Sequence, residues 1–108
     1  MKLITKEIRA KLAKNKGDAN VDKPYLKLFN PYGGGTWLIT EIAPDGMMFG
    51  LCDLGMGYPE LGYVHLKELE DLRVPPFDMP IERDMWFTPD KTLAEYADEA
   101  KENQRIVA

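Results

Sequence analysis

Residues 36–52, TWLITEIAPDGMMFGLC, decide the fold of this chain. The two ends of this stretch, 36–42 and 47–52, are rich in β-branched, aromatic and other large apolar side chains, which favour strands. Between them stands APDG at 43–46, in which proline presets one backbone dihedral and glycine tolerates a positive φ. The stretch therefore predicts two antiparallel strands joined by a tight turn.

Two more strand-like segments flank this hairpin. Residues 25–29, YLKLF, come before it, and the turn sequence NPYGGG at 30–35 separates them from it. Residues 61–64, LGYV, follow it after a connection rich in Gly and Pro. We therefore predict an antiparallel meander of three or four strands.

Helical patterns occur at both ends of the chain and once in the middle. Thr5 can cap a helix that runs to about residue 14, because its hydroxyl can accept a bond from a first-turn N–H. Leucines at helical spacing predict a short helix over 65–72. Thr92 and Glu95 form a capping box that starts the last helix, and the residues after it are expected to fray from position 104.

These elements predict one globular domain, residues 1–108, of the α+β class. Its antiparallel meander would be covered by the N-terminal, short middle and C-terminal helices. A chain of 108 residues with 44% hydrophobic content is long enough for a single modest core.

The stretch MPIERDMWFTP at 79–89 is expected to close the sheet. Its prolines bracket an eight-residue segment, 81–88, that suits an edge strand, where proline removes no ladder bond. Period-two alternation places the following residues on one side of that strand: Ile81, Arg83, Met85 and Phe87.

We expect Met85 and Phe87 to complete the core from this strand. Arg83 points away from its acidic neighbours and is expected to form a structural ion pair, although a site could form if it met a carboxylate from elsewhere, such as Glu41 or Asp53. Arg83 is also kept as a candidate binding residue, because the same pairing could build a site.

Composition limits the class of protein. No segment approaches the ~20 apolar residues that span a bilayer, and the N-terminus lacks a signal peptide's apolar stretch. A single cysteine forbids an internal disulfide and suits a reducing compartment. These features predict a cytoplasmic protein without a membrane partner.

The sequence contains few residues that could form a catalytic site. The chain has no serine, which excludes serine-nucleophile mechanisms, and one Cys with one His supplies no zinc ligand set. The GGGT sequence at 33–36 leads into a strand without a following lysine, unlike a phosphate loop. No metal and no cofactor is expected.

The enzyme alternative is a thiol-dependent hydrolase or transferase that uses Cys52 and His65. Such a dyad needs both side chains in hydrogen-bond reach, which pairing of their two strands could provide. The sequence favours a simpler interpretation, in which Cys52 is a small buried thiol and His65 caps a helix. The chain is therefore expected not to be an enzyme.

The loop at 54–60 is the preferred place for a partner surface. Met56, Tyr58 and Glu60 lie there in a Gly-rich setting, and Met and Tyr are common at adaptable protein interfaces. Loops of this length beside a compact sheet are often functional. A protein partner is therefore expected, although the sequence indicates neither its identity nor an oligomeric state.

Nucleic-acid binding is the other alternative. It would use the basic residues of the N-terminal helix: Lys6, Arg9, Lys11 and Lys14. The net charge of −4 argues against it, because binding to a phosphate backbone usually requires a basic face. These residues are expected to form a solvated helix face.

Four segments together resemble a family of small bacterial proteins that is classed as a domain of unknown function. They are LITKEIRAKL (3–12), TWLITE (36–41), MFGLCDLG…PELGYVHLKELEDLR (48–73) and MPIERDMWFTPDKTL (79–93). Proteins of this family are often borne on plasmids and phages. The resemblance implies a single-domain, cytoplasmic accessory protein of a mobile genetic element. Together with the residues discussed above, we expect a non-enzymatic, protein-binding factor, with action against host defence or support of transfer as hypotheses for its role.

Overall fold

The computed structural model describes residues 2–108. Its elements, in chain order, are α1 (Lys6–Ala13), β1 (Leu26–Phe29), β2 (Thr36–Ile42), β3 (Met47–Asp53), β4 (Glu60–His65), α2 (Leu66–Asp71), β5 (Arg73–Val74), β6 (Met79–Pro80), β7 (Glu82–Arg83) and α3 (Leu93–Asn103). The α+β class and the meander predicted from the sequence are confirmed.

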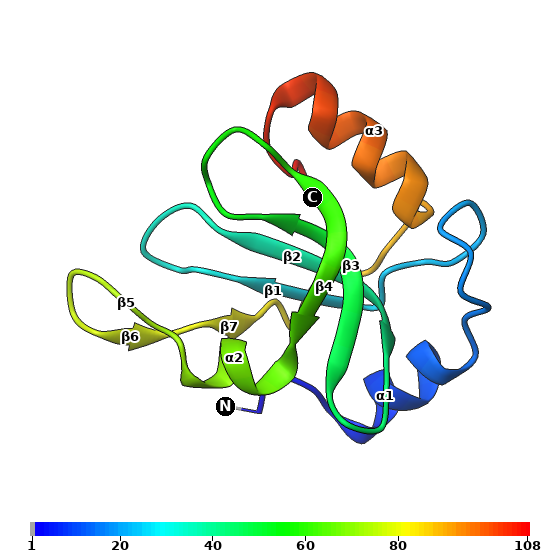
Figure 1. Cartoon of the computed structure of the whole chain (residues 1–108), viewed down its shortest axis with the longest axis horizontal. Coiled ribbons are helices and arrows are strands. Elements are labelled where there is room, and N and C mark those ends of the chain that lie inside the picture. Colours follow the sequence, from blue (N-terminus) through cyan, green and yellow to red (C-terminus); the bar gives the residue numbers. More distant parts are fainter. Residues whose placement is uncertain (1) are drawn as a thin grey trace.

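Five strands form one antiparallel sheet in the order β4-β3-β2-β1-β7, and β5 pairs with β6 in a separate small hairpin (Figure 1). The first four strands follow one another along the sheet as the meander requires. The fifth, β7, returns to the outer side of β1, where Leu28 lies opposite Arg83 and Phe29 opposite Glu82. Within residues 2–108, β4 and β7 are therefore the two edge strands of this sheet.

Both faces of the sheet are covered, which explains the unbroken burial of the central strand from Trp37 to Thr40. On one face, α1 and α2 pack Leu12 and Leu69 into a core around β1 and β2. On the other face, α3 packs against β2 and β3 in a second core, which consists of Leu38, Leu51, Leu93, Tyr96, Ala100 and Ile106. In Figure 1, α1 and α3 accordingly lie on opposite sides of the strands.

The helix caps form as the sequence predicted. The Thr5 hydroxyl accepts a hydrogen bond from the Ile8 N–H. The Thr92 hydroxyl accepts one from the Glu95 N–H, and the Glu95 carboxylate accepts one from the Thr92 N–H. The longest helix of the described residues, α3, has 11 residues, and no helix there is long and apolar enough to cross a membrane.

The predicted strand over 81–88 is much shorter in the structure. Only Glu82 and Arg83 pair with β1, and the chain then turns, because the Asp84 carboxylate accepts a hydrogen bond from the Trp86 N–H at 2.9 Å. The turn ends the period-two alternation, and Met85 is 60% exposed. The expectation that Met85 completes the core is therefore wrong, whereas Phe87 does pack partly buried against the core beneath α3.

Arg83 does not form the predicted ion pair in the part of the chain that the structure describes. Its guanidinium donates a hydrogen bond to the backbone carbonyl of Lys2, which ties the N-terminal segment to β7. The ion pair of this region joins Lys27 of β1 to Asp84, with 3.3 Å between Nζ and the carboxylate.

The C-terminal residues do not fray as expected. Gln104 ends α3 with φ of 58°, in the left-handed region that closes a helix, and the chain then folds back. Ile106 is buried, and its N–H donates to the carboxylate of Asp53 at 2.9 Å. The tail is thus held against the end of β3.

Candidate functional site

Large apolar side chains that face solvent gather around the β3–β4 connection. Three of them stand on the connection itself, and we call this set the loop tip: Leu54, Met56 and Tyr58. Two more stand on β4 and are called the β4 edge pair: Leu61 and Tyr63. Tyr58 is 78% exposed and Tyr63 74%. Large contiguous patches of exposed apolar side chains are rare on monomeric proteins, and they commonly mark interaction sites.

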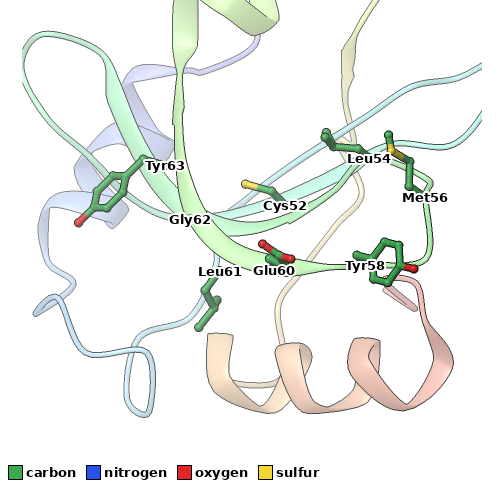
Figure 2. A pocket seen from close by; sticks show the side chains of 8 residues that line it. All are labelled: Cys52, Leu54, Met56, Tyr58, Glu60, Leu61, Gly62 and Tyr63. Carbon is green, nitrogen blue, oxygen red and sulfur yellow. The ribbon is translucent and has the colours of Figure 1, made fainter.

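A hollow of about 340 Å³ lies beside these residues (Figure 2). Its lining consists of Cys52, Leu54, Met56, Tyr58, Glu60, Leu61, Gly62 and Tyr63. Figure 2 shows the loop tip gathered at one end, whereas Tyr63 lies further along β4 and points away from it. The hollow is therefore an open recess along the strand.

The backbone of the connection is held by one buried carboxylate. Asp53, at the end of β3, accepts hydrogen bonds from the Gly55 N–H at 2.8 Å and from the Ile106 N–H at 2.9 Å. Because both carboxylate oxygens have a donor, this buried group is satisfied without a cation. Asp53 thus fixes where the loop tip begins.

The β3–β4 connection also packs closely against the β1–β2 connection at a pair of glycines. A Cβ added to Gly34 would lie 2.8 Å from the Cα of Gly55, so a side chain at Gly34 would push the two loops apart. Gly55 also has a φ of 80°, which side chains rarely adopt. The GGG sequence therefore serves this loop-to-loop packing.

The structure keeps Cys52 and His65 apart. Their strands do pair, as the dyad required, but Cys52 lies opposite Glu60 and His65 lies opposite Met47. Five residues of strand separate the two positions, or about 17 Å at the usual rise. The two side chains also point to opposite faces of the sheet. Cys52 shares a face with Glu60, its partner in the ladder, and His65 stands an odd number of positions from Glu60 on the same strand.

Neither side chain is prepared for catalysis. Burial raises the pKa of the Cys52 thiol to about 11, so the thiolate that would act as nucleophile is scarce near neutral pH. Both ring nitrogens of His65 are occupied: Nδ1 accepts from the Lys67 N–H at 3.1 Å, and Nε2 donates to the Asp45 carbonyl at 2.8 Å. His65 caps α2, as the simpler interpretation predicted.

Three of the four residues proposed for binding lie together. Met56, Tyr58 and Glu60 all line the hollow, although Glu60 begins β4 and does not belong to the loop. Arg83 lies on β7, at the opposite edge of the sheet. Their part in binding stays a prediction, and Arg83 cannot share one compact site with the others.

The basic residues of α1 do not line up as a single stripe. Lys6, Arg9, Lys11 and Lys14 are all exposed. At 100° per residue, they spread over roughly 200° of the helix circumference. Lys11 lies over the ring of Tyr25, 5.8 Å from its centre. Among residues 2–108, no three His, Cys, Asp or Glu side chains gather as a metal site would require.

The β4 edge pair could not be identified from the sequence pattern. Alternation places Leu61 and Tyr63 on the same face of a strand, but it does not show whether a neighbouring strand or helix covers them. Only the sheet order places β4 at an edge, and only the packing of α3 leaves both side chains exposed.

A family model described as "Protein of unknown function (DUF2958)" matches residues 3–107 of the chain. The match confirms the resemblance to a family of unknown function that the sequence segments suggested. No curated protein and no solved structure matches.

Proposed function

We propose that the chain, which belongs to the DUF2958 family of proteins of unknown function, is a non-enzymatic factor that binds another protein through its loop tip. The observation that carries the proposal is the exposure of Leu54, Met56 and Tyr58 on one connection. Isolated exposed apolar residues need no explanation, but three on one loop form a patch that a partner can cover.

The support of the loop tip strengthens this proposal. A flexible loop loses conformational freedom when a partner orders it, which weakens binding. Here Asp53 and the Gly34–Gly55 contact fix the connection before any partner arrives. Met supplies an adaptable apolar surface and Tyr a rigid one with a polar end, a combination typical of protein interfaces.

A non-enzymatic role agrees with the chemistry of the region. The thiol beside the hollow is held protonated, and the histidine is remote from it and engaged in a cap. The proposal extends, on the family resemblance, to an accessory factor of a mobile genetic element that acts in the cytoplasm, against host defence or in support of transfer.

The test compares partner capture by three versions of the protein. We expect the wild-type chain to recover a specific protein from its native host, and Met56→Lys/Tyr58→Lys to lose it, because two charges would enter the apolar contact. The matched control is Met85→Lys/Trp86→Lys, which changes a methionine and an aromatic of similar exposure on the turn after β7.

The control variant should retain the partner. Equal capture by the loop-tip variant and the wild type would refute the proposal. Loss of capture in both variants would also contradict it, because the effect would then not be specific to the loop tip.

A further inference from the structure

The free edge of β4 carries backbone groups that point into solvent. The Leu66 N–H donates to the Gly46 carbonyl at 2.9 Å, which sets the alternation of the β3–β4 ladder. Gly62 and Val64 therefore bond to β3, and the N–H and C=O groups of Leu61 and Tyr63 point away from it. No strand among residues 2–108 lies on that side of β4.

Neither backbone conformation nor packing within residues 2–108 requires a glycine at position 62. Its φ lies outside the left-handed region, and a Cβ added there would meet no atom within 4 Å. Gly50, its partner across the ladder, differs, because a Cβ there would collide with the Leu38 carbonyl. A glycine inside a strand weakens it and often marks the close approach of another backbone.

We propose that β4 pairs antiparallel with β4 of a second copy of this chain, about a two-fold axis at Gly62. The free groups of Leu61 and Tyr63 lie symmetrically on either side of Gly62, so this edge is complementary to itself. In the pair, Leu61 of one copy exchanges N–H···O=C bonds with Tyr63 of the other, and the reverse.

Side chains fit the same arrangement. Each Leu61 then stands beside Tyr63 of the second copy on one face of the joined sheet, which covers two side chains that are exposed in the single chain. The two Gly62 residues meet at a position without hydrogen bonds, where strands approach to about 4.5 Å between Cα atoms. The absence of side chains there permits that approach.

Charge does not oppose this pairing. The four central residues of β4, 61–64, carry no acidic or basic side chain. Glu60 of one copy lies opposite Val64 of the other, and the two Glu60 residues are about 14 Å apart along the strands. That distance exceeds the ~8 Å screening length at physiological ionic strength, so their repulsion is weak.

Sedimentation velocity over a concentration series tests the proposal. We expect the wild-type chain to shift from monomer to dimer, and Leu61→Lys/Tyr63→Lys to stay monomeric, because like charges would face each other across the axis. Met56→Lys/Tyr58→Lys adds the same charge nearby and should dimerise as the wild type does. Circular dichroism checks that both variants are folded.

A cross-link tests the register. In a Cys52→Ala background, Gly62→Cys should form a disulfide between copies under mild oxidation, because the two positions lie within the Cα distance that disulfides allow. Glu60→Cys, on the same face but about 14 Å from its equivalent, should not. The Gly62→Cys change is suited to this test because the site has room for the side chain.

A wild-type chain that stays monomeric throughout the series would overturn the proposal. A dimer that Leu61→Lys/Tyr63→Lys leaves intact, or one that cross-links at position 60 and not at 62, would overturn it as well. None of these results bears on the loop tip, whose test is partner capture, so the two proposals can fail independently.

Discussion

The two edges of the sheet end in different ways. At one edge, β7 is only two residues long, and both of them are charged. At the other, β4 is six residues long, and its four central residues carry no charge. Short strands, charges and prolines are the usual means by which proteins keep an edge from pairing with another chain.

This difference shows that exposed aromatic residues alone do not make a pairing edge. Trp86, beside β7, is 88% exposed, yet it stands on a turn whose backbone offers no strand to a partner. Tyr63 is less exposed but stands on a strand with free N–H and C=O groups. The fold itself completes the β7 edge, whereas the β4 edge is left for a second molecule.

The largest expected effect is a difference between the two edges in how much a truncated side chain reduces the free energy of unfolding. Ile81 is buried in the core just before β7, and Ile81→Ala should reduce the free energy of unfolding by about 2–5 kcal/mol through the lost contacts and the cavity. Leu61→Ala, at β4, should reduce it by less than about 1 kcal/mol in the monomer, because that side chain is already 44% exposed. Urea unfolding at low protein concentration measures both, and equal losses would contradict the comparison.

A second prediction tests whether the strand next to β4 is also accessible to solvent. Cys52 lies opposite Glu60, one strand inward, and burial raises the pKa of its thiol from 9.0 to about 11. The thiolate fraction at pH 8 should then be about 100-fold below that of the unfolded chain, and alkylation should slow accordingly. Comparison of iodoacetamide rates in native and denaturing buffer checks this.

The sign of the associated stability change follows from the same shift. Because the folded pKa is raised, the neutral thiol is favoured by the fold, and stability should decrease as the pH rises from about 9 towards 11. Rapid alkylation of the native protein at pH 8 would contradict the prediction, because it would show that the Cys52 thiol is accessible to the reagent.

The smallest expected effect lies at the start of α3. Hydrogen bonds from Thr92 hold the pKa of Glu95 below its usual range, so the capping box is complete at neutral pH. The stabilisation is lost as the pH falls through that lowered pKa, because the carboxylate must then be protonated. The first turn of α3, whose Tyr96 packs against Phe87, should loosen before β4 does.

Amide chemical shifts of Thr92 and Glu95, followed by NMR during acid titration, measure this loosening. Glu95→Gln is the control, since it keeps an acceptor for the cap without a group that titrates in this range. A titration that is the same in both proteins would rule out Glu95 as its source.

Local signals explain what the sequence predicted well. The APDG turn and the composition of its flanks located β2 with its observed bounds, and Thr5 and Thr92 marked helix starts correctly. Each of these features depends on a few neighbouring residues, so tertiary contacts were not needed to find them.

What failed depended on contacts between distant segments. Met85 was misplaced because alternation holds only while a strand has a partner, and β1 offers pairing over two residues of β7. The distance between Cys52 and His65 depends on register, which a sequence pattern does not fix. Ile106 was expected in a frayed tail because its acceptor, Asp53, is remote along the chain. The openness of the β4 edge was missed for the same reason.

The contact between Gly34 and Gly55 means that a substitution outside the loop tip can change the position of the loop tip. Neither glycine would touch a partner through a side chain, yet a methyl group at Gly34 would have to displace the loop that carries Met56 and Tyr58. A single substitution in the β1–β2 connection could therefore alter binding affinity while every contacting residue stayed the same. In an alanine scan, Gly34 would register as a hot spot outside the footprint of the interface.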